Sequence, residues 1–497
     1  MFYFGVKVLV LFISLFISCY ADDRKNIVFI LTDDQDLELH GLMPMTKTLS
    51  LIANKGITFE NAFVTTPICC PSRSSILTGL YAHNHKAFNN SEEGGCAGET
   101  WRNLENQTFG AYLHGNNYKT FYAGKYLNQY KANYVPKGWD WWIGLKENSR
   151  YYDYDLSING SVKHFNDEYL PDLMKEHALN FLDTIGDTQP FLMVLSTPSP
   201  HSPSTPALRH IGKYKNVTAP RTENFNKHFE DKHWLLNMPP KVLSQTAVDE
   251  LDRIYRTRWE CLLAVDDMVE AIIQTLDNLK ILDNTYIIYT SDNGYHIGQF
   301  AQAYDKRQPY ETDIKVPLLI RGPGVPKKKL ISNPVANIDL APTLLDLAGL
   351  NVPDHMDGKS FSAAFLKESD NMNKKGFQER QILFEYWGEE NPHTISEKCS
   401  QWHGDKHLAR CDPIVDCRCQ DVGNNTYTCI RHMASDMNFM FCRFRDNDYF
   451  EEAYNLVKDP LELKNIAYEI LPDIRVKYTN VIDHMKHCVG EQCHKIY

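Results

Sequence analysis

Acidic and amide side chains follow apolar runs at separate places in the chain. Asp33 and Asp34 end the run NIVFILTDD, and Asp292 and Asn293 follow NTYIIYTS. These side chains supply only oxygen donors, which suit a hard cation such as calcium or magnesium better than zinc. A third run, PFLMVLSTPSP, leads into His201. Helix capping explains any one acidic pair equally well, but three such run ends together favour a metal site.

The stretch TTPICCPSRSSILTG raises a second chemical possibility. It places Cys69 and Cys70 before Pro71 and Arg73. Proline fits the first turn of a helix, where its missing N–H costs nothing, and Gly79 can end that helix. A helix start favours negative charge, and the Arg73 side chain can point back towards it. Two structural cysteines with partners elsewhere and a thiolate nucleophile are both compatible with this pattern.

Four basic side chains stand out against an acidic background. They are Lys125 in YAGKYLNQY, His201 in PSPHSP, His296 in SDNGYHIGQF and Lys306 in AYDKRQPYE. The formal net charge is -11, which argues against a general nucleic-acid binder and makes a local group of cations a candidate anion site. Each of these residues taken alone is more often solvated or simply packed.

The apolar runs indicate the elements that position these residues. Three runs and a fourth, VPLLIRGPG, lack polar alternation, as do strands buried on both faces of a parallel sheet. The segment ECLLAVDDMVEAIIQTLDNL, residues 260–279, has helical periodicity and precedes one run as a crossover helix would. We therefore expect an α/β domain over residues 22–385, with its ligands beyond the carboxyl ends of the strands.

The sequence from residue 386 to residue 497 differs from the preceding part in its cysteine content and its hydrophobic pattern. Most of the 13 cysteines lie there, between Cys399 and Cys493. The segments MNFMFCRFR and YFEEAYNLVKDP alternate weakly, so we expect a smaller, disulfide-stapled domain with an antiparallel sheet. Pairing cannot be deduced from spacing. The charged segment 207–245 shows neither period and predicts a long surface excursion.

The first 21 residues resemble a cleaved secretory signal, with Lys7, an apolar run and small residues before the cleavage point. No second apolar run of spanning length follows, so no membrane span is expected. The secretory pathway, with a lysosomal or secreted destination, is the expected location. Glycosylation sequons agree, and they begin at Asn89, Asn106, Asn159, Asn216 and Asn424.

The pattern C-x-P-S-R followed by LTG resembles the signature of the type I, formylglycine-dependent sulfatases. The resemblance implies that Cys69 is converted to formylglycine by a formylglycine-generating enzyme, whereas Cys70 fills a variable position. In that family the hydrated aldehyde attacks the sulfur of a sulfate ester, which is covalent catalysis. The resemblance also implies an alkaline-phosphatase-like α/β fold with a mostly parallel sheet flanked by helices.

The family pattern assigns roles to the residues singled out above. The implied catalytic residues are Cys69, Arg73, Lys125, His201 and Lys306. The implied ligands of Ca²⁺, or of Mg²⁺, are Asp33, Asp34, Asp292, Asn293 and the modified Cys69 side chain. Many arylsulfatases carry a histidine two residues after the lysine, where this chain has Leu127. His296 is therefore a candidate substrate-binding residue.

The resemblance implies hydrolysis of sulfate esters of glycosaminoglycans, at the 6-sulfate of N-acetylglucosamine in heparan or keratan sulfate. Heparan 6-O-endosulfatases share the same stretches but carry a long basic insertion that this chain lacks, and arylsulfatase activity is a further alternative. A phosphatase or phosphodiesterase of the same fold would use Ser or Thr as nucleophile and two zinc ions. An inactive secreted binding protein is the non-catalytic alternative.

Overall fold

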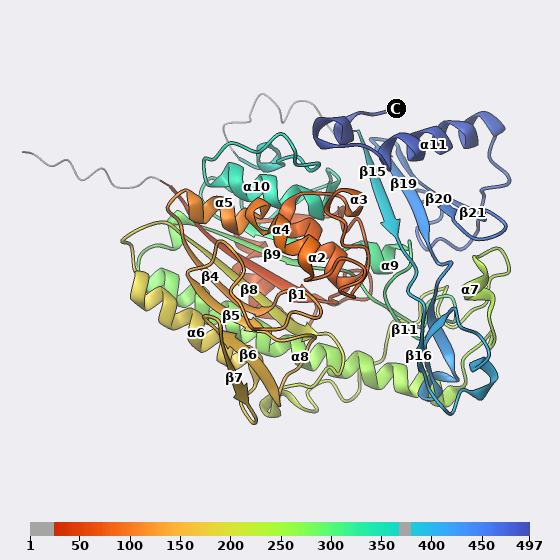
Figure 1. Ribbon diagram of the computed structural model, residues 1–497, viewed down its shortest axis with the longest axis horizontal. Coiled ribbons are helices and arrows are strands. Elements are labelled where there is room, and N and C mark those ends of the chain that lie inside the picture. Colours follow the sequence, from red (N-terminus) through yellow and green to blue (C-terminus); the bar gives the residue numbers. More distant parts are fainter. Residues whose placement is uncertain (1–23, 367–378) are drawn as a thin grey trace, which may run out of the picture.

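A ten-stranded mixed sheet forms the centre of the computed structural model, which describes residues 24–366 and 379–497 (Figure 1). The expected signal segment lies outside these residues. The strand order is β13-β2-β12-β9-β1-β8-β4-β5-β6-β7. The strands span β1 Asn26–Asp33, β2 Ile57–Phe59, β4 Lys119–Lys125, β5 Trp141–Leu145, β6 Tyr154–Ile158, β7 Ser161–Phe165, β8 Phe191–Pro200, β9 Thr285–Ser291, β12 Leu318–Arg321 and β13 Lys329–Ile331.

The middle of the sheet is parallel and its flanks are not. Strands β9, β1, β8, β4 and β5 run side by side in one direction. The run VPLLIRGPG, expected to be parallel, forms β12 and lies antiparallel to both β9 and β2. An apolar run shows that a strand is buried on both faces but carries no information on its direction. The parallel block brings the ends of β1, β4, β8 and β9 to one edge.

Alternate residues of β1 face two different hydrophobic cores. Ile27, Phe29 and Leu31 pack into the core beneath helices α2, α5 and α10, whereas Val28 and Ile30 pack into the core with α6 and α8. Figure 1 shows these two helix groups on opposite faces of the sheet. The helices span α2 Cys69–Thr78, α5 Phe109–Gly115, α6 Leu170–Ile185, α8 Gln245–Asn278 and α10 Leu340–Leu347. Burial on both faces explains why β1 lacks polar alternation.

Shorter elements surround this framework. The helices are α1 Thr46–Leu51, α3 Ala82–His85, α4 Glu99–Leu104, α7 Trp234–Asn237 and α9 Glu311–Ile314. Two small sheets pair β3 Ala62–Phe63 with β14 Val335–Ala336 and β10 His296–Ile297 with β11 Tyr304–Asp305. The segment between β8 and α8 is largely irregular, as expected for a long excursion. No helix in the described ranges is long and apolar enough to cross a membrane.

The cysteine-rich part contains two sheets, one of which is the expected antiparallel sheet. It orders β15-β19-β20-β21, with α11 Pro472–Met485 packed on it. Its strands span β15 Arg380–Tyr386, β19 Tyr427–Ala434, β20 Met437–Phe444 and β21 Glu451–Asn455. The boundary expected after residue 385 therefore cuts through β15. That strand joins the second sheet by backbone pairing with β19, which no local signal in the sequence reveals.

The other sheet of this part is held by disulfides. It joins β16 Asn391–Ile395, β17 Leu408–Asp412 and β18 Arg418–Val422. Cys411–Cys419 links β17 to β18, and Cys399–Cys417 ties the preceding loop to the same hairpin. The pairs Cys429–Cys442 and Cys488–Cys493 lie further along the chain. Clustering of disulfides in this region was expected, and the structure supplies the pairing.

Helix α8 is longer than its periodic segment and holds the end of β1. It begins at Gln245 rather than near Glu260, and Ser244 caps it by accepting a hydrogen bond from the Ala247 N–H. Near its middle, Arg258 donates to the backbone carbonyl of Asp34 at 2.6 Å. Asp34 has φ of +68°, a left-handed conformation that is costly for a residue with a Cβ. The contact from α8 therefore helps to fix a strained turn beside the predicted metal ligands.

Replacing Gly79 tests the end of helix α2. Gly79 has φ of +72°, and a Cβ there would lie 3.2 Å from Met356 Sδ and Pro342 Cδ. We expect Gly79→Ala to lower the free energy of unfolding by about 1–2 kcal/mol in urea denaturation, because strain and crowding add. Gly115→Ala is the control, because a Cβ at Gly115 meets nothing within 4 Å. A loss of equal size in both variants would contradict this account.

Replacing Arg258 tests the contact between α8 and β1. Arg258 is 1% exposed and also lies 3.1 Å from the Asp36 carboxylate. We expect Arg258→Met to lower the free energy of unfolding by about 3–5 kcal/mol, because it leaves a buried acid without its partner. Arg253→Met removes an exposed arginine that pairs with Glu250 on the same helix, and we expect a change below about 0.5 kcal/mol. Urea denaturation of both variants decides, and equal effects would refute the role assigned to Arg258.

Candidate active site

The two neighbouring cysteines differ in their bonding. Cys70 forms a disulfide with Cys96. Cys69 is a free thiol, is fully buried and is the first residue of α2. Burial raises the pKa of the Cys69 thiol to about 12, although Lys125 and Lys306 oppose the shift. A thiolate nucleophile is therefore disfavoured at this position, because the unmodified side chain stays protonated at neutral pH.

The acids at the end of β1 meet Cys69. Its Sγ lies 3.5 Å from Asp33 Oδ1 and 3.9 Å from Asp34 Oδ1. His201, just beyond β8, completes a group whose ligand atoms all lie within 4.8 Å of one another. Two polar ends of parallel strands thus converge with the start of α2, as the strand-end rule predicted. This acidic group has the composition and compactness of a metal site.

Asp292 and Asn293 join this group from the end of β9. The Asp34 N–H donates to Asp292 Oδ1 at 3.0 Å, and the Asn293 side chain donates to Asp34 Oδ1 at 2.8 Å. Asn293 Oδ1 is buried without a hydrogen-bond partner. A buried acceptor without a donor is costly, and a cation beside it would satisfy it. The predicted ligands therefore fit a hard cation held by oxygen atoms.

Three buried cations enclose the acids. Lys125, at the end of β4, lies 2.7 Å from Asp33 Oδ2, and Lys306, after β11, lies 2.7 Å from Asp34 Oδ2. Arg73, one turn into α2, lies 2.7 Å from Asp292 Oδ2. Lysine and arginine almost never occur fully buried without a partner. The predicted cations and the predicted metal ligands are thus parts of one network.

The cations set the ionisation of the acids. Burial alone would raise the pKa of Asp33, but Lys125 above all, together with Arg73, holds it well below its ordinary value. Burial raises the pKa of Asp292 to about 7, and Arg73 opposes this shift. An additional cation in the pocket would ionise Asp292 fully. A cation bound beside Asp292 would therefore lower the pKa of its carboxyl group again.

His201 lies at the mouth of this pocket with its side chain 13% exposed. Its Nδ1 lies 2.6 Å from the Ser202 carbonyl oxygen, which fixes that nitrogen as the donor. Nε2 faces Asp34 Oδ2 at 3.8 Å. Burial lowers the pKa of His201 to about 4, although Asp33 and Asp34 oppose the shift. The imidazole is therefore neutral before any anion binds.

His296 pairs with Asp313, and Ser149 contacts Asp33. His296 bonds through Nδ1 to Asp313 at 3.0 Å. Within the described residues no hydrogen bond or ion pair joins it to Asp33, Asp34, Asp292 or Cys69, so its substrate-binding role stays a prediction. Ser149 was missed: its hydroxyl donates to Asp33 Oδ2. Ser149 lies just beyond β5. The sequence pattern did not predict β5, so Ser149 could not be recognised as a residue at a strand end.

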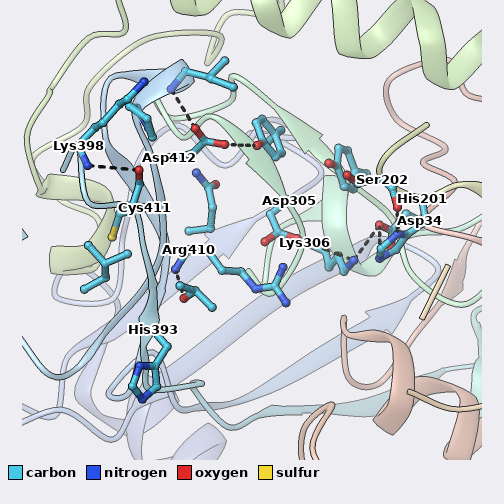
Figure 2. Close-up of a pocket in the computed structure, with 18 residues that line it drawn as sticks. Asp34, His201, Ser202, Asp305, Lys306, His393, Lys398, Arg410, Cys411 and Asp412 are labelled. Carbon is cyan, nitrogen blue, oxygen red and sulfur yellow. Dashed lines mark hydrogen bonds and ion pairs between the residues drawn. The ribbon is translucent and has the colours of Figure 1, made fainter. Parts of the chain in front are cut away.

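A cavity of about 650 Å³ opens from the cluster (Figure 2). Asp34, His201 and Lys306 line one side, and the disulfide-held sheet of β16, β17 and β18 lines the other. Figure 2 places Asp34, His201 and Lys306 together at one end and His393, Lys398 and Arg410 towards the other. Its volume falls in the range of small-molecule sites. The cavity therefore has room for more than the group that meets Cys69.

The sequons lie outside the catalytic cluster. Asn106, Asn159 and Asn216 are exposed, whereas Asn89 and Asn424 are half-buried. The Asn424 side chain accepts a hydrogen bond from Trp234 Nε1 at 3.0 Å. Glycosylation at these positions stays a prediction.

Comparisons with known proteins agree with this geometry. The sulfatase family model matches residues 25–350, and the model described as N-sulphoglucosamine sulphohydrolase, C-terminal, matches residues 298–403. N-acetylglucosamine-6-sulfatase of Capra hircus is 44% identical over 483 residues, covering 95% of this chain and 85% of that protein. An extracellular sulfatase SULF-1 homolog of Drosophila melanogaster is 41% identical over 356 residues, covering 70% of this chain but 32% of that protein.

A solved structure supports the fold. It holds a protein in complex with its substrate D-glucosamine-2-N,6-O-disulfate, and it superposes with a TM-score of 0.75 at 23% identity over 95% of this chain and 98% of that chain. At this identity the likeness concerns the fold alone, and it confirms the expected α/β architecture. The family model covers more than half of the chain, and the alignment with the goat protein covers 95% of this chain and 85% of that protein. The chain belongs to the sulfatase family.

Proposed function

We propose that this sulfatase hydrolyses the 6-sulfate ester of N-acetylglucosamine in glycosaminoglycans of the heparan or keratan sulfate type. The observation that carries the proposal is a free, buried Cys69 at a helix start, enclosed by acids and by three buried cations. The goat relative supports the substrate class, because it is an N-acetylglucosamine-6-sulfatase. The solved structure compared above holds a 6-O-sulfated glucosamine, which is consistent with it.

We infer that Cys69 is converted to formylglycine and that a calcium ion, or magnesium, binds beside it. Asp33, Asp34, Asp292 and Asn293 would hold the ion, which would offset negative charge on the sulfate oxygens. A cysteine at this position disfavours the phosphatase alternative, which calls for Ser or Thr. The unmodified thiol is protonated and enclosed, so conversion supplies the nucleophile that the thiol cannot.

The cations of the chain would bind and polarise the sulfate ester. Lys125, Lys306 and Arg73 are fixed by ion pairs before substrate arrives, so little reorganisation accompanies the reaction. A bound sulfate adds negative charge next to His201, which raises its pKa and favours the protonated imidazole. We propose that His201 then donates to the departing alcohol oxygen or supports the donor.

The remaining features are consistent with the secretory pathway. Disulfides persist in oxidising compartments, and this chain pairs ten cysteines as Cys70–Cys96, Cys399–Cys417, Cys411–Cys419, Cys429–Cys442 and Cys488–Cys493. We propose a lysosomal or secreted destination, glycosylation at the exposed sequons and maturation by a formylglycine-generating enzyme.

Calcium titration tests the metal site without measuring activity. We expect calcium to raise the melting temperature, because a ligand at a hundred times its Kd stabilises the folded state by about 2.7 kcal/mol. Asn293→Ala removes one proposed oxygen ligand and should reduce the shift. Asn103→Ala, at an exposed asparagine, should leave the shift unchanged. If calorimetric melts of the protein without substitutions show no response to calcium or magnesium, the metal assignment is wrong.

Turnover assays on defined substrates test the proposed reaction. We expect faster hydrolysis of 6-sulfated N-acetylglucosamine than of 2-sulfated sugars or aryl sulfates. Cys69→Ala should lower kcat by at least about 10³-fold, because it removes the nucleophile. Cys261→Ala removes the other free, buried cysteine of the described ranges and should keep kcat within about two-fold.

Mass spectrometry of the tryptic peptide that contains Cys69 completes this test. An aldehyde in active protein supports the formylglycine assignment. Full activity with an unmodified thiol would refute that assignment, and preference for aryl or 2-sulfated substrates would refute the substrate class.

A further inference from the structure

The cavity beside Cys69 has acidic groups that are already satisfied. Lys306 pairs with Asp34, and Arg307 pairs with Asp305. Asp412 accepts hydrogen bonds from the Tyr304 hydroxyl and from the Ile414 N–H at 2.9 Å. None of these carboxylates therefore needs a further cation from the cavity wall.

The basic groups on the opposite wall lack such partners. His393, Lys398 and Arg410 line the cavity, and no side-chain hydrogen bond or ion pair joins them to any residue of the described ranges. Figure 2 shows the Arg410 side chain extending from its strand towards Asp305 and Lys306. Burial opposes ionisation of Asp305, but Arg307, Lys306 and Arg410 together lower its pKa to about 2. Against the effect of burial, Arg307 and Arg410 also lower the pKa of Glu389, so the charge of Arg410 acts on nearby acids. Its guanidinium N–H groups, however, make no hydrogen bond within the described residues and face the cavity as donors for a ligand.

The position of Arg410 is fixed although its guanidinium is free. Its N–H donates to Thr394 Oγ1 at 2.7 Å. Its φ is +56°, a conformation that persists only where the surroundings impose it. The next residue, Cys411, is paired to Cys419 across the β17–β18 hairpin. A guanidinium on so constrained a backbone can bind an anion with little loss of conformational entropy.

We propose that Arg410, supported by Lys398 and His393, forms a second anion subsite for the sugar that adjoins the one being desulfated. The subsite would take a carboxylate or a second sulfate on that neighbouring sugar. Arginine suits this task because its planar donors match both anions. The inference rests on the proposed function, since it assumes that a 6-sulfated sugar occupies the end of the cavity near Lys306.

Matched variants and paired substrates test the subsite. Arg410→Asn removes the guanidinium with a residue type that tolerates positive φ, and Lys406→Asn removes an exposed cation of the same domain that does not line the cavity. The substrates are 6-sulfated N-acetylglucosamine alone, linked to galactose, and linked to a uronic acid with or without a second sulfate.

We expect Arg410→Asn to lower kcat/KM about ten-fold on the uronic-acid substrates, mainly through KM, because a charge-assisted contact is lost. The loss should be below two-fold on the free monosaccharide and on the galactose-linked substrate, because neither has a charged neighbouring sugar. Arg410→Lys should recover part of the loss, and Lys406→Asn should behave like the protein without substitutions. A loss that needs the second sulfate identifies sulfate as the anion, and a loss without it identifies the carboxylate.

Other outcomes overturn the subsite. Equal losses on all substrates would make Arg410 a general structural residue, and no loss on uronic-acid substrates would remove it from substrate binding. Calorimetric binding of the same saccharides to Cys69→Ala, with and without Arg410→Asn, gives the answer independently of turnover. Failure of the proposed function would give a different result, because the protein without substitutions would then leave every 6-sulfated substrate intact.

Discussion

The proposed active site depends on keeping carboxylates ionised inside the protein. Asp33 and Asp34 are buried, and an isolated buried carboxylate would take up a proton instead of staying charged. Lys125 and Lys306 prevent this by direct ion pairs. These two lysines come from different strand ends, β4 and the turn after β11, so the charge balance exists only when the sheet is assembled. These ion pairs therefore form only as the sheet folds.

The neighbouring cysteines show how one dipeptide serves two purposes. Cys70 anchors the start of α2 to the following loop through its disulfide with Cys96. Cys69 forms no disulfide with any described residue, is fully buried, and has a thiol pKa that burial raises. An enclosed, protonated thiol exchanges poorly with other disulfides. The geometry that presents Cys69 to the acids thus also protects it from pairing with the wrong cysteine.

Local sequence signals predicted the elements and residues that local chemistry determines. The apolar runs located β1, β8 and β9 and the polar groups at their ends, and proline and glycine located both ends of α2. Long-range pairing was beyond these signals. The direction of β12 follows from backbone bonds to β9 and β2, and β15 from bonds to β19. The contact of Arg258 with Asp34 joins residues 224 positions apart, so no window along the chain contains it.

Helix α8 links the two walls of the cavity beside Cys69. Its 34 residues extend about 50 Å at 1.5 Å per residue. At its start, the Ser244 hydroxyl donates to Asp416, which lies between the disulfide-held strands β17 and β18. Further along, Arg258 holds the turn of Asp34. A helix rotates by about 100° per residue, so a single inserted residue between these contacts would turn one of them away. Only insertions of nearly whole turns would keep both contacts on their present faces of the helix.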